Sequence, residues 1–170
     1  MTLAEIGLSN GQRVTLRLEQ AEDEPLLFQL YASTREDELA LTGWDAATRA
    51  QFLQGQFQAQ RAGYRSQFPN GEFNIVLLDA AAIGRLVLNQ TADELRLVDI
   101  VLAPAARNRG LGTALVQAVL AEAARQNKAF RLHVIRHSPA VRLYERLGFR
   151  KLGEHGFHDE MKWRPAPQKP

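Results

Sequence analysis

A short basic segment with two glycines, RNRGLG at 107–112, could bind an anion. It follows an apolar run, 95–102, and precedes an Ala- and Leu-rich segment, 111–125, so the expected order is strand, loop and helix. The first N–H groups of a helix lack partners, and the helix dipole is positive there. Glycine lets an anion approach them, and arginine adds positive charge. The pattern predicts a phosphate-binding loop, with an ordinary strand-to-helix turn as the alternative.

Two common phosphate-binding loops do not fit this segment. A Walker loop ends in Gly-Lys-Ser/Thr, whereas Gly112 is followed by Thr113 and Ala114. The Rossmann fingerprint needs a third small residue, and Leu115 stands at that place. What remains, Arg-x-x-Gly-x-Gly, resembles the coenzyme A pyrophosphate loop of the GNAT superfamily, the acyl-CoA-dependent N-acetyltransferases.

The resemblance implies acetyl-CoA as co-substrate. The loop would hold the pyrophosphate, and backbone N–H groups of the preceding strand would serve the thioester carbonyl and the pantetheine arm. Asn108 stands where glycine is usual, and asparagine is the non-glycine residue that best tolerates a positive φ. The cofactor-binding residues expected in this part of the chain are Ile100, Val101, Leu102, Arg107, Asn108, Arg109, Gly110, Leu111, Gly112 and Thr113.

A second segment, SPAVRLYERLGF at 138–149, is typical of a short capped helix, with Ser138 as N-cap and Gly148 after the last turn. The spacing turns Tyr144 inward, where a core tyrosine is the simplest interpretation. The segment also resembles the second GNAT motif, Asn-x-x-Ala-x-x-x-Tyr-x-x-x-Gly-Phe, which implies that Tyr144 protonates the departing thiolate. His137 replaces the asparagine that contacts pantetheine in the family, and we expect His137 and Ser138 to contact the cofactor.

Acetyl transfer to an amine also needs a base, because an alkylamine is almost fully protonated at neutral pH. Asp99 is the candidate, since it is the only carboxylate inside the apolar run LRLVDIVL and aligns with an acidic position of many GNAT members. An ion pair with Arg96 or Arg131, or a contact with a backbone amide, is the alternative explanation of this carboxylate. A water chain could also replace the base.

The acceptor pocket is expected at the first helix pair and the last hairpin. Its candidate residues are Tyr31, Trp44 and His133, with Phe157 and His158 on the hairpin. A hydrophobic seam is the alternative for the aromatic residues, and a core histidine is the alternative for His133. His133 and His137 have a zinc-like spacing, but no third ligand is evident, so we predict no metal site.

Hydrophobic periodicity predicts the elements that position these residues. The order β-α-α-β-β-β-α-β-α-β-β indicates an α+β fold with a central mixed sheet flanked by helices, which matches the GNAT fold. We expect one domain over 1–164 and a disordered tail over 165–170. The expected strands are 13–18, 73–78, 83–88, 95–102, 130–135, 149–152 and 157–163, and the expected helices are 22–34, one that begins after Asp45, 111–125 and 138–147, with a charged break at 35–38.

Composition excludes several classes. The chain has 170 residues, no cysteine and a net charge of +2 from 21 basic and 19 acidic residues. The lack of cysteine excludes disulfides and an acyl-cysteine intermediate, and it favours a cytoplasmic location. The balanced charge indicates no nucleic-acid partner, and the lack of a long apolar run indicates no membrane span.

These observations predict an N-acetyltransferase that moves the acetyl group of acetyl-CoA to a primary amine of a small molecule or peptide by direct attack. The alternatives are a GNAT-fold module that binds acyl-CoA without turnover, an acyltransferase with another donor, and a regulator that binds a nucleotide phosphate. Many GNAT members form homodimers, although no segment of this sequence marks an interface.

Overall fold

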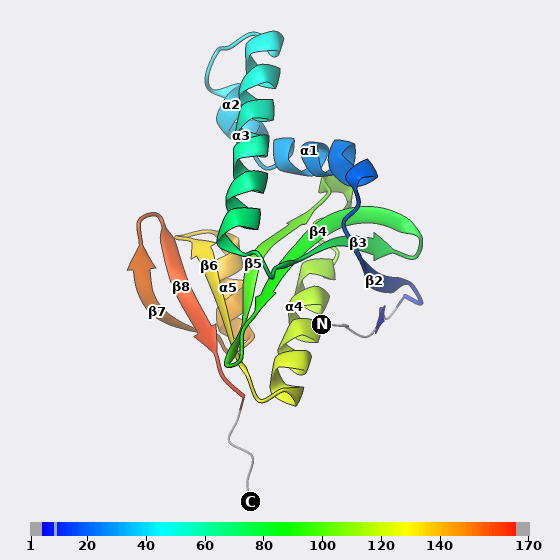
Figure 1. Cartoon of the computed structure of the whole chain (residues 1–170), viewed down its shortest axis with the longest axis vertical. Helices are drawn as coiled ribbons and strands as arrows, with labels where there is room; N and C mark the ends of the chain where they lie inside the picture. Colours follow the sequence, from blue (N-terminus) through cyan, green and yellow to red (C-terminus); the bar gives the residue numbers. More distant parts are fainter. Residues whose placement is uncertain (1–4, 9, 166–170) are drawn as a thin grey trace, which may run out of the picture.

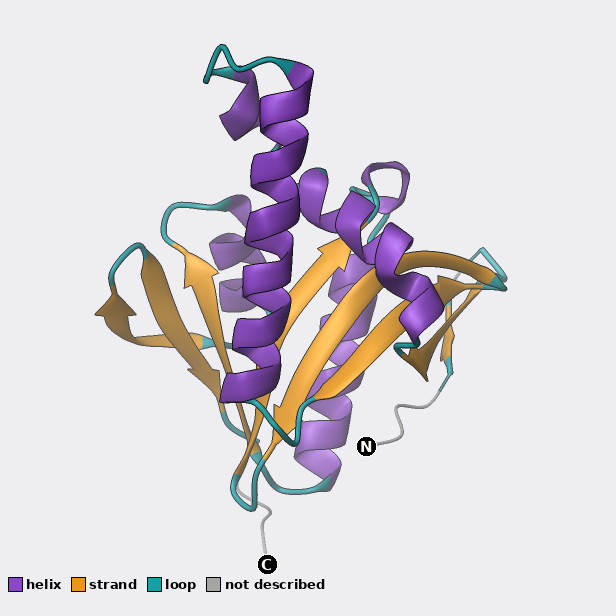
Figure 2. Cartoon of the chain, turned by 45° about the horizontal axis from the view of Figure 1, so that its top comes forward, coloured by secondary structure: helices purple, strands orange, loops and turns teal. Residues whose placement is uncertain are grey.

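A single eight-stranded sheet runs through the computed structural model, which describes residues 5–8 and 10–165. Helices α1 and α3 cover one face of the sheet, and α4 and α5 cover the other (Figures 1 and 2). The strands are β1 (Ile6–Gly7), β2 (Arg13–Leu18), β3 (Glu72–Leu78), β4 (Ala81–Gln90), β5 (Glu94–Leu102), β6 (Ala129–Ile135), β7 (Arg150–His155) and β8 (His158–Trp163). The helices are α1 (Glu24–Ala32), α2 (Glu36–Ala40), α3 (Ala46–Gln67), α4 (Leu111–Arg125) and α5 (Pro139–Arg146).

The sheet order is β1-β2-β3-β4-β5-β6-β8-β7, and only β5 and β6 are parallel neighbours. They are joined through α4, because a parallel pair needs a crossover connection. Their pairing begins at Glu94 with Ala129 and ends at Leu97 with Leu132. Beyond that point the rest of β5, 98–102, has no strand partner on its β6 side within the described chain. The sheet therefore splits between these two strands.

A bulge lies at the start of the split. Val87 pairs with Asp99 and the next residue, Leu88, pairs with Leu97, so Val98 is an extra residue in β5. A bulge bends its strand and increases the local twist. Here it coincides with the point where β5 leaves β6.

Apolar side chains form a core on each face of the sheet. The larger core packs α4 and α5 against the strands and contains Leu95, Leu97 and Leu115. The smaller core lies under α1 and α3 and joins Leu27, Leu30, Tyr31, Phe57 and Ile75. Strand β5 contributes to both, which explains why its sequence is nearly all apolar.

The predicted mixed sheet flanked by helices is confirmed, and α4 has the predicted bounds. Asp45 caps α3, since its carboxylate accepts a bond of 2.7 Å from the Thr48 backbone N–H. Strand β1 was not expected, and α2 begins inside the segment 35–38 that was expected to break the chain. Of the expected tail, only Pro165 belongs to the described residues. Among the described helices, none has the length and apolar composition needed to cross a bilayer.

Candidate functional site

A pocket of about 330 Å³ lies between the free part of β5, the loop after it, α4 and α5. We call it the loop pocket. Nine of the residues predicted to bind or act on a cofactor line it, and they come from three separate segments: Ile100, Leu102, Arg107, Asn108, Gly110, Leu111, Gly112, Thr113 and Tyr144. Val116, Ala140 and Leu143 complete the wall.

The loop backbone leaves open space over its two glycines. Gly110 has φ +77° and is followed directly by α4, and a Cβ there would meet no atom within 4 Å. A Cβ on Gly112 would come no closer than 4.0 Å to Leu102. Asn108 has φ 58°, which confirms that it takes over a glycine conformation. An anion can therefore approach the first N–H groups of α4 without meeting a side chain.

The two loop arginines are engaged elsewhere, contrary to the simple expectation that both add free charge. Arg107 donates from Nε to the Leu102 carbonyl oxygen at 2.9 Å and from Nη2 to the Ser33 hydroxyl at 2.6 Å. Arg109 is exposed and donates to Gln12 at 3.3 Å, and it does not line the loop pocket. Arg107 thus ties the loop to β5 and to the end of α1.

Tyr144 is buried on the inward face of α5 and is only 6% exposed. Burial, with a smaller contribution from the charge of Asp99, raises its pKa to about 12. The hydroxyl is therefore protonated at neutral pH. Its ring packs edge-on against Phe149 at 5.5 Å between centroids, which fixes its orientation toward the pocket.

Besides Arg109, three predicted cofactor residues lie outside the loop pocket. The side chain of Val101 packs into the smaller core on the opposite face. His137, which has φ 63°, and Ser138 line a separate cavity with Lys151 and Glu154. Ser138 occupies the N-cap position of α5, but its hydroxyl is buried without a partner among the described residues and makes no cap bond. The N-cap prediction was therefore right for the backbone and wrong for the hydroxyl.

Asp99 forms a partly buried ion pair, but not with the expected arginines. Its Oδ2 accepts from Nε of Arg85 at 2.9 Å and from Nη2 of the same guanidinium. Arg85 also donates to Gln60 of α3, so the pair lies on the α3 face of the sheet. Both bonds use Oδ2, and no described residue donates to Oδ1. Burial raises the pKa of Tyr64, and the charge of Asp99 raises it further. Asp99 therefore acts on tyrosines of both faces of the sheet.

A second pocket, of about 260 Å³, opens on the α3 face. We call it the histidine pocket. Its wall comes from the end of α3, from β5 at the bulge and from β6, β7 and β8: Tyr64, Gln67, Phe68, Arg96, Leu97, Val98, His133, His155 and His158. Since Val98 lies where β5 and β6 separate, the two pockets approach the split from opposite faces of the sheet.

The structure separates the residues predicted to line the acceptor side. His133 and His158 lie in the histidine pocket. Tyr31 instead packs on Phe57 of α3 at 5.8 Å between ring centroids, inside the smaller core that α1 and α3 form on the sheet. Trp44 lies at the start of α3, 39% exposed, with its ring 5.2 Å from that of Phe52. Neither residue lines the histidine pocket.

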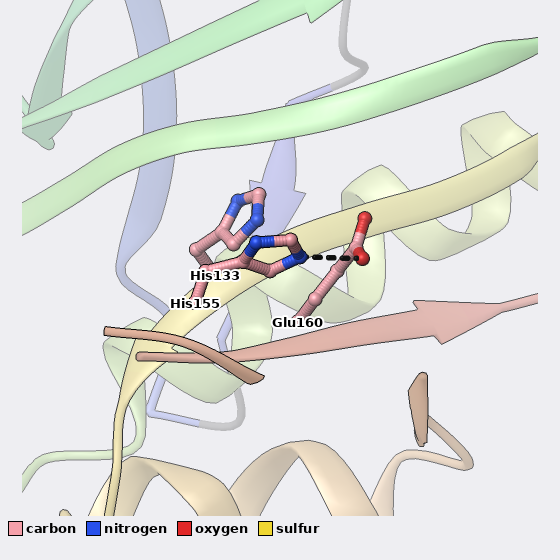
Figure 3. Close-up of side chains that lie close together, drawn as sticks. All are labelled: His133, His155 and Glu160. Carbon is pink, nitrogen blue, oxygen red and sulfur yellow. Dashed lines mark hydrogen bonds and ion pairs between the residues drawn. The ribbon is translucent and has the colours of Figure 1, made fainter. Parts of the chain in front are cut away.

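His133 has ligand-type neighbours that the sequence did not indicate. Ligand atoms of His133, His155 and Glu160 lie within 4.8 Å of one another, and Nε2 of His155 is 3.2 Å from the Glu160 carboxylate (Figure 3). His137, the partner considered from spacing, lines another cavity. Glu160 is also bound by Arg131. Burial lowers the pKa of His133, and the charge of Arg96 lowers it further. This positive surrounding opposes a metal cation.

Several pocket residues escaped the sequence analysis. Ala140 and Leu143 share the inward face of Tyr144, so their helical spacing could have indicated them. Tyr64, Gln67 and His155 gave no such signal, because only the tertiary fold brings the end of α3 over the last hairpin.

Comparisons with known proteins agree with this geometry. The PaiA N-acetyltransferase of Thermoplasma acidophilum, in complex with coenzyme A, is 21% identical with a TM-score of 0.64, over 89% of this chain and 98% of that one. Ard1 of Thermoplasma volcanium is 21% identical with a TM-score of 0.60, over 90% and 98%. An acetyl-CoA-bound GNAT acetyltransferase of Elizabethkingia anophelis is 17% identical with a TM-score of 0.55, over 89% and 97%.

These likenesses concern the fold, and a comparison with curated protein sequences found no match. A family model described as the acetyltransferase (GNAT) family matches residues 30–149, which is more than half of the chain. The split sheet, the glycine loop at α4 and the inward tyrosine of α5 all lie within that range. The chain is therefore an acyltransferase that belongs to the GNAT family.

Proposed function

We propose that the protein transfers the acetyl group of acetyl-CoA to a primary amine of a small molecule or peptide. One observation carries the proposal: the loop pocket joins an open helix N-terminus, a free strand edge and the protonated hydroxyl of Tyr144. An acyl-CoA-dependent transfer needs these three features in one cavity, for the pyrophosphate, the pantetheine arm and the departing thiolate. The coenzyme A and acetyl-CoA complexes of similar fold support this cofactor.

In this proposal acetyl-CoA lies along the free edge of β5. The pyrophosphate accepts hydrogen bonds from N–H groups at 110–113, where no Cβ of Gly110 or Gly112 intervenes. The pantetheine amides pair with the backbone groups of 98–102 on the side that faces away from β4, as an added strand would. The proposed cofactor contacts of His137 and Ser138 require the arm to pass the N-terminal end of α5.

The proposed reaction is a direct displacement. The amine nitrogen attacks the thioester carbonyl carbon, and backbone N–H groups of β5 stabilise the oxyanion of the tetrahedral intermediate. The intermediate collapses with cleavage of the C–S bond, and the Tyr144 hydroxyl gives its proton to the thiolate. The tyrosinate regains a proton from water. The products are an amide and free CoA.

Asp99 is proposed to accept the amine proton, directly or through water, at its Oδ1, because Arg85 occupies Oδ2. His133 is the competing group, since burial followed by the charge of Arg96 lowers its pKa and leaves a neutral imidazole at pH 7. If Asp99 is the base, Asp99→Asn lowers kcat about 100-fold or more while His133→Gln retains it. The reverse result in the steady-state rates would assign the proton to His133.

Three further statements belong to this proposal. The reaction uses no metal, because Arg131 and Arg96 surround the only described cluster of ligand-type side chains on the acceptor side. The protein acts in the cytoplasm, which the lack of cysteine supports. The acyl donor is acetyl-CoA, whereas a longer donor such as succinyl-CoA would indicate a different acyltransferase.

Thermal unfolding with and without ligands is the first test. A ligand at 100 times its Kd adds about 2.7 kcal/mol, which corresponds to a rise in Tm of about 5 to 10 °C for a chain of this size. We expect that rise with acetyl-CoA and not with ATP or NAD, followed by thiol release when amines are added. Binding without thiol release for any amine would favour the module without turnover. No rise with acetyl-CoA would reject the proposal.

A further inference from the structure

The histidine pocket has an unusual charge for a site that would receive an amine. Its described lining includes Arg96, His133, His155 and His158, and no acidic side chain is among the nine residues named above. A pocket for a cationic group, such as the second amine of a diamine, would need carboxylates in its wall. This wall offers N–H donors and positive charge instead.

The ion pairs beside the pocket leave a surplus of positive charge. Glu94 lies 3.1 Å from Nε of Arg131, 3.4 Å from Nη2 of Arg96 and 3.7 Å from Nζ of Lys162. Glu160 is held by Arg131 and by His155. Three permanent cations therefore share two carboxylates. Arg96 is the member of this group that lines the pocket, and its contact with Glu94 is longer than that of Arg131.

We infer that the acetyl acceptor is a small amine that also carries an anionic group, a carboxylate or a phosphate, and that Arg96 binds this group. The inference rests on the proposed function and names the substrate class of the same site. A guanidinium is suited to both anions because its donors match pairs of oxygens. His133 is a second donor, since a neutral imidazole still carries one N–H, and it lies beside His155 at 5.5 Å between ring centroids (Figure 3).

The position of Arg96 also sets the distance between the amine and the anionic group of the acceptor. Arg96 pairs with Asn89 and Asp99 with Val87, so the bulge at Val98 leaves the two Cα atoms about two strand residues apart, or about 7 Å along β5. The amine must reach the split near Asp99 while the anion remains at Arg96. An acceptor with several methylene groups between the two groups fits this arrangement better than an α-amino acid.

A panel of acceptors tests the inference on the unaltered protein. Three amines of equal length differ only at the far end: 5-aminopentanoate is anionic, pentylamine neutral and 1,5-diaminopentane cationic. We expect kcat/KM in the thiol-release assay to be at least about 10-fold higher for 5-aminopentanoate than for pentylamine, and lowest for the diamine. Glycine and 3-aminopropyl phosphate test the spacing and separate carboxylate from phosphate.

Substitutions of Arg96 test whether it binds the anionic group of the acceptor. Arg96→Gln should lower kcat/KM about 10- to 100-fold for 5-aminopentanoate and much less for pentylamine. Arg96→Lys should recover part of the loss. Arg125→Gln, at the exposed end of α4, is the matched control and should change neither rate. The rise in Tm with acetyl-CoA shows in each case that the variant is folded and its cofactor site intact.

The outcomes separate the two proposals. If the three amines react equally, or if Arg96→Gln affects them equally, the inference is overturned and the proposed function stands. If acetyl-CoA neither raises the Tm nor supports thiol release, the proposed function itself fails. If acetyl-CoA binds and no amine reacts, calorimetric titration of the CoA-bound protein decides: tighter binding of 5-aminopentanoate than of pentylamine, lost in Arg96→Gln, supports the inference, and equal or absent binding overturns it.

Discussion

In the proposed mechanism the hydroxyl of Tyr144 must hold its proton until the thiolate leaves. Burial supplies this property, and the negative charge of Asp99 adds to it, so the pKa rises from 10.0 to about 12. The same side chain lines the loop pocket, which means that a buried group still has access to the proposed sulfur position. A raised pKa also makes its proton harder to transfer, and the negative charge that forms on sulfur provides the driving force.

Replacing Tyr144 by phenylalanine removes the proposed proton donor and keeps the ring that packs on Phe149. We expect kcat to fall about 10²- to 10⁴-fold, because the thiolate must leave without general acid catalysis. The KM for acetyl-CoA and the rise in Tm with acetyl-CoA should stay nearly unchanged. Steady-state kinetics check both values, and full activity of Tyr144→Phe would contradict the general-acid role.

The raised pKa of Tyr144 also predicts how stability depends on pH. Between pH 10 and 12 the unfolded chain loses this proton while the folded chain keeps it, so the free energy of unfolding falls as the pH rises. The full stabilisation is present below pH 10, and a shift of this size corresponds to a loss of about 2 kcal/mol at pH 12, which approaches about 3 kcal/mol only above that pH. Denaturant unfolding of the native protein and of Tyr144→Phe measures it, since the variant should lack this part of the pH dependence. Parallel curves would disprove the assignment.

Strand β4 holds the free edge of β5 in place. Gly84 of β4 pairs with Leu102, and a Cβ at Gly84 would lie 2.5 Å from the Val101 carbonyl oxygen and 2.7 Å from the Leu102 side chain. The two strands can therefore approach closely only because residue 84 has no side chain. Arg107 adds a second restraint, because it binds the Leu102 carbonyl oxygen from the loop.

The variant Gly84→Ala should push the end of β5 out of position. We expect a loss of about 1 to 3 kcal/mol in the free energy of unfolding, which is the usual cost of overpacking, and a higher KM for acetyl-CoA. Gly63→Ala is the matched control: no atom lies within 4 Å of its added Cβ, and alanine in a helix should stabilise α3 by about 0.5 to 1 kcal/mol. Denaturant unfolding gives both values. An unchanged KM in a destabilised Gly84→Ala would mean that this part of β5 does not hold the cofactor.

The elements were predictable where one segment carries its own signal. Asp45 is followed by a helical pattern, and the glycine loop is followed by a helix with the predicted bounds. Contacts between distant segments carry no such signal. Arg107 binds Ser33, which is 74 residues away, and Asp99 pairs with Arg85 and not with Arg96. Periodicity tells which face a side chain takes, but not which distant helix will cover it.

At the scale of the whole molecule, two pockets to which we assign different tasks lie near the split in the sheet. The loop pocket lies on the face of α4 and α5, and the histidine pocket on the face of α3. If acetyl-CoA uses the first and the acceptor uses the second, the two substrates approach from opposite sides. The histidine pocket draws on several separate segments, so only the assembled fold could reveal this division.

Two variants that fill one pocket each should distinguish the two binding routes. Gly112→Val places a side chain in the open space over the loop, so the rise in Tm with acetyl-CoA and the activity should both be lost. Gln67→Trp, from the exposed end of α3, should fill the histidine pocket, keep the rise in Tm and lower kcat/KM for the amine about 10-fold or more. The Tm without ligand reports whether the fold of each variant is intact. If Gln67→Trp abolished acetyl-CoA binding as Gly112→Val should, both substrates would share one route and the two-sided arrangement would be wrong.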